Sequence, residues 1–148
     1  MFNKKAFFIV FEGIEGSGKS YHCKKIIKFL NKKKIKTKSI REPGGCETAE
    51  KIRNLILKGK TNKFDKFTDT LLYLAARNEN FNKNIKINLL KKQVMICDRF
   101  VDSTIAYQSY GLGVNKLLIE RINNHILNNI KPDLVIYLYA NKKIINKR

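Results

Sequence analysis

Short apolar runs alternate along the chain with longer segments in which apolar residues recur every three or four positions. The short runs predict β-strands, at residues 6–11, 36–40, 94–97 and 134–139. The longer segments predict amphipathic helices, with apolar stripes made by Ile26, Ile27 and Leu30, by Ile52, Leu55 and Ile56, and by Leu118, Ile122 and Ile126. The stretch 66–90 predicts one or two more helices. Such alternation is typical of an α/β fold with a parallel sheet and helices on both faces.

The segment after the first predicted strand reads Gly-Ile-Glu-Gly-Ser-Gly-Lys-Ser and matches the GxxxxGK[ST] pattern of a phosphate-binding loop. Glycines let the backbone N–H groups converge on phosphate oxygens, and the helix expected from Lys19 points its positive dipole end at the same anion. Lys19 adds a charge for the outer phosphates, and the Ser20 hydroxyl suits Mg²⁺. We therefore expect nucleoside triphosphate to bind at Gly13, Ile14, Glu15, Gly16, Ser17, Gly18, Lys19 and Ser20.

Unusual residues follow three of the predicted strands. The phosphate loop follows the first strand, residues 41–45 follow the second and residues 98–100 follow the third. Because ligands of a parallel sheet bind beyond the carboxyl ends of its strands, the three segments are expected to converge on one rim. Asp98 ends an apolar strand and would place a carboxylate beside the Mg²⁺ held by Ser20. The alternative is that Asp98 caps a helix expected near Val101.

The chain is strongly basic, with 31 Lys and Arg residues against 12 Asp and Glu residues and a net charge of +19 over 148 residues. Such a charge suggests nucleic-acid binding. Few of these cations are arginine, however, and the lysines mingle with Asn and Ile throughout the sequence. A binding face would concentrate charge and add arginine and stacking aromatics. We therefore expect a solvated surface that attracts anionic nucleotides but does not bind nucleic acid.

The three cysteines, Cys23, Cys46 and Cys97, are odd in number and form no CxxC pair. This spacing argues against a disulfide framework and against a zinc site. Cys97 lies in an apolar run and is expected to pack as a small hydrophobic residue. Both histidines, His22 and His125, are expected at the surface. The chain shows no secretory signal and no membrane-spanning run, so a cytoplasmic protein is expected.

Further segments resemble the thymidylate kinases of the bacterial type. They are residues 41–45 with their continuation 49–53, then 72–77 and 98–108, in order after the phosphate-loop segment 11–20. The resemblance implies the α/β fold of the P-loop nucleoside monophosphate kinases, a three-layer sandwich around a parallel sheet. It also implies ATP-dependent phosphorylation of dTMP to dTDP with Mg²⁺ in dTTP biosynthesis, and a homodimer.

The resemblance assigns roles to residues that contact the acceptor nucleotide. Glu15 would meet the 3′-hydroxyl of the sugar, Tyr73 would stack on the thymine ring, and Arg77 would donate to a carbonyl of the base. Tyr73 and Arg77 are four residues apart in a predicted helix and therefore share a face. Ordinary core packing is the alternative for Tyr73. Arg41 and Arg99 would hold the acceptor phosphate, a task that suits planar forks of donors.

Ser103, Tyr107 and Gln108 lie on the segment with which the family lines its nucleoside pocket. Ser103 and Tyr107 share a face if residues 101–109 are helical. Tyr107 could exclude a 2′-hydroxyl, and Gln108 could bond to a pyrimidine edge unless it is simply a solvated helix residue. An acceptor monophosphate is largely ionised at neutral pH, so no strong base is required. Catalysis would rest on alignment and positive charge from Lys19, Arg41 and Arg99.

The sequence departs from the family pattern in small ways at Cys46, where the family often has a hydroxyl residue, and at Leu112, where it often has arginine. Two larger departures bear on the mechanism. Gly16 stands where some members carry an arginine, and other members supply arginines from a lid that follows the fourth strand and its next helix. Here the sequence stops at Arg148, so we interpret residues 1–148 as one P-loop kinase domain that lacks its lid and last strand. Two alternative functions are a deoxynucleoside kinase and an inactive protein that only binds nucleotide. The segments 41–45 and 98–100 argue against the first alternative.

Overall fold

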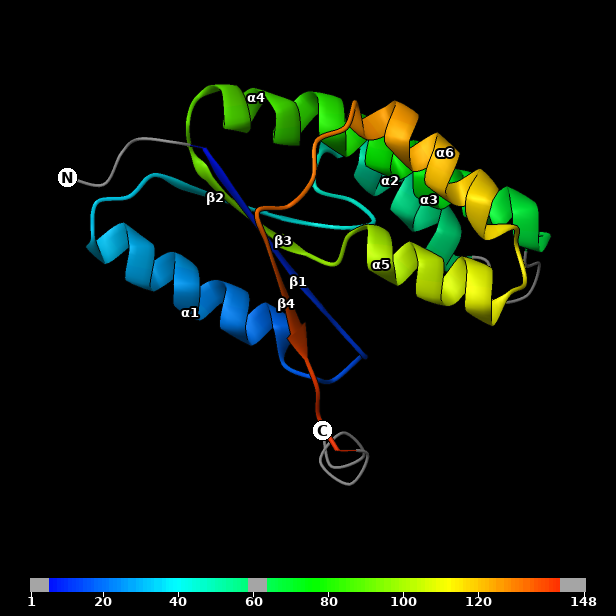
Figure 1. The fold of residues 1–148 in the computed structure, drawn as a ribbon, viewed down its shortest axis with the longest axis horizontal. Helices are drawn as coiled ribbons and strands as arrows, with labels where there is room; N and C mark the ends of the chain where they lie inside the picture. Colours follow the sequence, from blue (N-terminus) through cyan, green and yellow to red (C-terminus); the bar gives the residue numbers. More distant parts are fainter. Residues whose placement is uncertain (1–5, 59–63, 142–148) are drawn as a thin grey trace.

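A four-stranded parallel sheet forms the centre of the computed structural model, which describes residues 6–58 and 64–141 (Figure 1). The strands are β1 (Phe7–Gly13), β2 (Thr37–Arg41), β3 (Val94–Asp98) and β4 (Leu134–Leu138), in the spatial order β2-β3-β1-β4. Each begins and ends within two residues of its predicted run. The register pairs Asp98 with Phe11 on one side and with Arg41 on the other. The carboxyl ends of β1, β2 and β3 therefore meet at one edge.

Helices cover both faces of the sheet, which confirms the predicted α/β architecture (Figure 1). Helix α1 (Lys19–Lys32) lies on one face. On the other, α3 (Lys66–Asn80) continues through the π-helical turn η1 (Phe81–Ile85) into α4 (Lys86–Leu90), and α2 (Glu47–Lys58) packs against α3. The same face carries α5 (Val101–Thr104), its π-helical continuation η2 (Ile105–Gly111), and α6 (Lys116–Leu127). Within the described residues, no helix is long and apolar enough to cross a membrane.

Strand β1 separates two apolar clusters because successive side chains of a strand point to opposite faces. Phe8 and Val10 are buried against Phe81, Ile85 and Leu127 from the helices of the larger layer. On the other face, Ile9 and Phe11 pack with Cys23 and with the predicted α1 stripe of Ile26, Ile27 and Leu30. Cys97 is fully buried, as expected for a small hydrophobic residue, and both His22 and His125 are exposed.

Two predicted helical stripes were wrong in detail. Helix α6 buries Ile119, Asn123 and Leu127, whereas Leu118 is 38% exposed. The buried face is thus turned by one residue from the predicted stripe. The reason is that Asn123 bonds to a buried polar network, so the inward face is not purely apolar. Leu55 of α2 is also exposed, whereas Ile52 and Ile56 of its predicted stripe are partly buried and Ala49 is fully buried.

The burial of the cysteines leads to a prediction about their reactivity. Burial raises the pKa of the Cys23 thiol to about 12 and raises the pKa of the Cys97 thiol well above its ordinary value, so neither forms thiolate near neutral pH. Cys46 is only partly buried. Titration of the native protein with a chromogenic disulfide at pH 8 is expected to modify Cys46 alone, whereas denatured protein should release three equivalents. Rapid modification of Cys23 or Cys97 in the folded state would contradict this burial.

Candidate active site

The loop between β1 and α1 holds a backbone shape that requires glycine. Gly13, Gly16 and Gly18 have φ angles of 137°, 75° and 90°, values that side chains rarely tolerate. A Cβ atom on Gly13 would also collide with the carbonyl oxygen of Leu138 in β4. Helix α1 begins at Lys19, as predicted, and no side chain caps its first turn. Its free N–H groups and dipole therefore face the loop, an arrangement suited to an anion.

Lys19 lies folded over the loop and is nearly buried. Its Nζ donates hydrogen bonds to the carbonyl oxygens of Gly13, at 2.8 Å, and Ile14, at 2.7 Å. Burial lowers its pKa, and the charge of Arg99 lowers it further. The Ser17 hydroxyl is buried in the same loop and has no hydrogen-bond partner in the described part of the chain. An ammonium and an unsatisfied hydroxyl beside free helix N–H groups fit a phosphate chain.

The structure brings Ser20 and Asp98 together. Ser20 Oγ donates to Asp98 Oδ2 at 2.6 Å across the gap between α1 and β3. Asp98 does not cap the next helix, since α5 starts after Phe100 and has no side-chain cap, so that alternative was wrong. No group of three or more His, Cys, Asp or Glu side chains in the described residues could hold a metal. Mg²⁺ fits the Ser20–Asp98 pair because it commonly takes only one or two protein oxygens plus phosphate and water.

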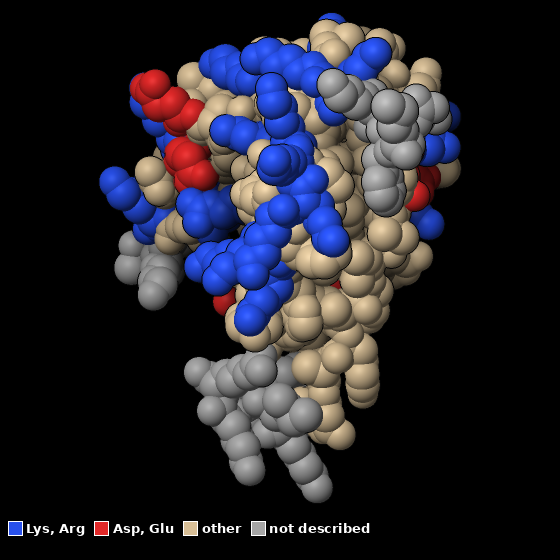
Figure 2. Space-filling model, turned by 90° about the vertical axis from the view of Figure 1, so that its left-hand side faces the viewer, with Lys and Arg blue, Asp and Glu red and all other residues tan. Residues whose placement is uncertain are grey.

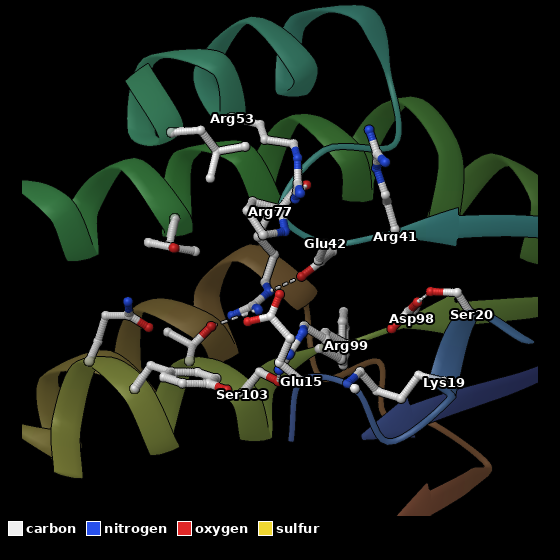
Figure 3. Close-up of a pocket in the computed structure, with 18 of the residues that line it drawn as sticks. Glu15, Lys19, Ser20, Arg41, Glu42, Arg53, Arg77, Asp98, Arg99 and Ser103 are labelled. Atoms are coloured by element: carbon white, nitrogen blue, oxygen red, sulfur yellow. Dashed lines mark hydrogen bonds and ion pairs between the residues drawn. The ribbon is translucent and has the colours of Figure 1, made fainter. Parts of the chain in front are cut away.

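Arg99 has a left-handed backbone, with φ of 70°, which is uncommon for a residue other than glycine. Its N–H donates to the carbonyl oxygen of Phe11 at 2.9 Å, which anchors the turn to β1. The Arg99 guanidinium donates from Nη1 to Ser103 Oγ at 3.1 Å and lies over the Tyr107 ring, 5.4 Å from its centre. The turn thus directs this cation across the mouth of the phosphate loop (Figure 3).

Glu12 is a buried acid of β1 to which the sequence analysis gave no role. Its carboxylate accepts the N–H groups of Phe100, at 2.7 Å, and Ser103, at 3.2 Å, and also the Ser103 hydroxyl, at 2.6 Å. These bonds satisfy the free N–H groups at the start of α5. Glu12 therefore fixes Ser103, and through it Arg99, relative to the phosphate loop. The sequence did contain a signal for this role, because Glu12 is an acidic residue within an otherwise apolar strand.

Arg77 of α3 lies at the centre of a buried polar network. Its Nε donates to Glu42 Oε2 at 2.7 Å, and both side chains are only 3% exposed. Its terminal nitrogens donate to Asn123 Oδ1 at 2.7 Å and to Thr104 Oγ1 at 2.9 Å. Asn80 completes the network with a bond to the second oxygen of Glu42. Three of the five N–H groups of Arg77 are thereby used, so the network orients the guanidinium while leaving donors for a ligand.

Two further arginines line the side of the site formed by β2 and α2. Arg41 donates to Glu50 at 3.0 Å and remains largely exposed. The Gly45 N–H, more than Arg41 itself, lowers the pKa of Glu50. Arg53, which the sequence analysis did not select, donates to the carbonyl oxygen of Pro43 at 2.8 Å. Both guanidinium groups lie toward the same cavity (Figure 3).

One cavity of about 690 Å³ joins these groups. Predicted site residues line it, namely Glu15, Gly16, Gly18, Lys19, Ser20, Arg41, Tyr73, Arg77, Asp98, Arg99, Ser103, Tyr107 and Gln108. Gly13, Ile14 and Ser17 shape the loop without lining the cavity. Its other lining residues had no predicted role, and they are Tyr21, Glu42, Pro43, Arg53, Leu57, Phe100 and Thr104.

The cavity has two chemically different ends. Lys19 lies at the phosphate loop, and Arg41, Arg53 and Arg99 add positive charge to the lining. At the other end, Tyr73 is half-buried and burial raises the pKa of its hydroxyl, so it stays neutral. Gln108 is buried beside it on η2 and donates to Asp69 at 3.4 Å, so it is not a solvated helix residue. The cavity can therefore hold a molecule with a polyanionic end and a flat polar ring.

Comparison with known proteins identifies relatives over most of the chain. The family model for thymidylate kinase matches residues 11–148. The chain is 38% identical to a thymidylate kinase of Clostridium novyi, covering 97% of this chain and 70% of that protein. It is 42% identical to one of Ehrlichia ruminantium, covering 90% and 62%. The crystal structure of thymidylate kinase from Ehrlichia chaffeensis superposes with a TM-score of 0.86 at 36% identity, over 97% of this chain and 76% of that one. The chain also spans less than two thirds of the length of further thymidylate kinases, 61% of that of Bacillus pumilus and 64% of that of Ehrlichia chaffeensis.

Proposed function

Because the chain belongs to the thymidylate kinase family, we propose that it transfers the γ-phosphoryl group of ATP to the phosphate of dTMP. The products are ADP and dTDP, a step of dTTP biosynthesis. The observation that carries the proposal is the single cavity in which the phosphate loop meets Tyr73, Arg77 and Gln108. Phosphate-binding groups and a base-sized polar end share one space, as a transfer between two nucleotides requires.

The donor end is the loop of β1 and α1. Its N–H groups and Lys19 would hold the β- and γ-phosphates of ATP, and Lys19 would exchange its bonds to Gly13 and Ile14 for phosphate oxygens. Ser20 and Asp98 would hold Mg²⁺, which, when bound, neutralises charge on the phosphates. No protein base is needed, because the acceptor phosphate is already ionised at neutral pH.

The acceptor end is built from α3, η2 and the strand ends. Arg41 and Arg99 would clamp the dTMP phosphate against the loop, which fixes its oxygen in line with the γ-phosphorus of ATP. Tyr73 would stack on the base while Arg77, already oriented by Glu42, would donate to a base carbonyl. Gln108 would face the pyrimidine edge, Tyr107 the sugar, and Glu15 its 3′-hydroxyl. Ser103 would hold Arg99 in place.

A coupled assay that follows ADP formation tests the proposal. With ATP and Mg²⁺ present, dTMP is expected to react at least about 100-fold faster, by kcat/KM, than dGMP or AMP, because a ring pocket with paired buried donors rejects bases that leave those donors unpaired. Phosphorylation of thymidine in preference to dTMP would instead identify a deoxynucleoside kinase. Calorimetric binding of dTMP and ATP without ADP formation would identify a protein that only binds nucleotide.

Assembly and location are also parts of the proposal. We propose that residues 1–148 form one P-loop kinase domain that works as a homodimer in the cytoplasm. Exposed apolar side chains support self-association, among them Phe67 and Leu71, one turn apart on α3, and Leu117 of α6. The three free thiols suit a compartment that keeps cysteine reduced.

A further inference from the structure

Lysines gather at the edge of the sheet opposite the nucleotide cavity. Figure 2 shows a nearly continuous band of basic side chains down this side of the molecule, with acidic side chains only toward its margins. We name as the lysine face the exposed lysines at the C-terminal end of α1, in the α1–β2 connection, in β2 and in the α4–β3 connection. They are Lys32, Lys33, Lys34, Lys36, Lys38, Lys91 and Lys92.

The fold creates this concentration of charge. The sequence contains no Asp or Glu between Glu15 and Glu42, or between Glu79 and Asp98. β2 and β3 are parallel neighbours, and the Val94 N–H donates to the carbonyl oxygen of Lys36 at 3.0 Å. The two acid-free segments therefore lie side by side. The lysines are therefore spread along the sequence but concentrated in space. The earlier expectation of a solvated surface that binds no nucleic acid rested on their spread along the sequence alone.

Helix ends account for part of the lysine face, because Lys32 lies in the last turn of α1, and Lys33 and Lys91 are the C-terminal caps of α1 and α4, where cations favour the helix dipole. None of its seven lysines takes part in an ion pair within the described residues. Lysines on an edge strand hinder edge-to-edge association, and Lys38 fits that role. Lys33, Lys34, Lys91 and Lys92 lie in connections outside the strand. The face also lies far from the cavity, since Thr37 and Arg41 at opposite ends of β2 are separated by about 13 Å.

We propose that the lysine face binds the phosphate backbone of single-stranded nucleic acid without reading its sequence. Lysine ammoniums are point charges that suit phosphates, and the face has no arginine fork for base edges. Phe29 of α1, 60% exposed with the Lys33 ammonium 6.0 Å from its ring centre, offers a surface on which a base can stack. Thr37, Ser39 and Gln93 beside the lysines are polar, whereas Ile35 and the exposed Leu90 are apolar, and a partner held by charge and by stacking fits this mixed surface.

Fluorescence anisotropy with a labelled oligodeoxycytidylate tests the proposal. Cytosine is chosen so that thymine in the active site plays no part. If about five lysines contact phosphates, log Kd should change with log salt with a slope of about 3.5, so affinity falls about 100-fold between 50 and 200 mM salt. Replacing Lys33, Lys36, Lys91 and Lys92 together by Gln should remove most of that slope. Phe29→Ala should weaken binding about 5- to 100-fold with the slope unchanged.

A charge-matched variant separates a binding face from a general effect of net charge. Lys51→Gln, Lys58→Gln, Lys66→Gln and Lys116→Gln together remove four exposed charges from α2, α3 and α6 and should leave affinity within about 3-fold. Equal losses in the two quadruple variants would overturn the proposal. Displacement of the oligonucleotide by excess ATP, or binding to phosphatidylserine vesicles with none to the oligonucleotide, would overturn it as well. Kinase activity should be the same in both variants, so failure here is distinct from failure of the proposed reaction.

Discussion

Lys19→Ala is expected to lower kcat/KM for ATP-dependent phosphorylation of dTMP by about 1,000-fold, because it removes a preorganised positive charge from the transferring phosphoryl group. Because the charge acts in the transition state, kcat should decrease more than the affinity for ATP. Calorimetry measures the change in ATP affinity. The fold should persist. Burial already disfavours the ammonium and lowers its pKa, so its removal does not expose an unbalanced charge.

Lys24→Ala is the matched control for this prediction. Lys24 is also in α1 but is exposed and lies outside the nucleotide cavity, so its removal should change kcat/KM less than about 2-fold and the melting temperature hardly at all. If Lys19→Ala retained more than a tenth of the activity, the assignment of the donor phosphates to this loop would fail. A large drop in melting temperature for Lys19→Ala would instead show that its bonds to Gly13 and Ile14 support the fold.

The fold was largely predictable because its signals are local. Strands β1, β3 and β4, of five to seven residues with apolar side chains on both faces, stand out from helices with a single apolar stripe. The glycines before Lys19 also set where α1 begins. Helix faces were less predictable, since Asn123 in α6 faces inward to meet Arg77. Apolar periodicity cannot detect a buried polar contact between residues distant in sequence.

The site was predictable where a motif or a helical spacing placed its residues. Ser20 and Asp98 are 78 positions apart, yet the strand-end rule brought them to one edge, where they form a hydrogen bond. Glu12 and Glu42 had no assigned role because their partners are backbone N–H groups and a distant arginine. Glu12 supports Ser103 without lining the cavity, and Glu42 lines the cavity beside the Arg77 that it orients. Their importance emerges only once three-dimensional contacts are known.

Glu42→Gln is expected to lower the free energy of unfolding by about 3–5 kcal/mol, because it leaves the buried Arg77 guanidinium without a counter-charge. Glutamine has nearly the same shape, so the loss reports charge rather than a cavity. Urea denaturation followed by circular dichroism measures it. The variant should also bind dTMP more weakly, since Arg77 lines the cavity and loses the negative charge that orients its guanidinium.

Two further variants separate the buried pair from ion pairs in general. Glu47→Gln breaks the exposed pair with Lys51, where both side chains are more than 70% accessible, and should cost less than about 0.5 kcal/mol. Adding Arg77→Met to Glu42→Gln removes the unbalanced charge and should recover at least half of the lost stability, although not dTMP binding. Simple additivity of the two losses would show that Arg77 and Glu42 stabilise the fold independently. Recovery of stability without recovery of binding would instead show that the unbalanced charge caused the loss of stability and that the guanidinium itself is needed for the acceptor.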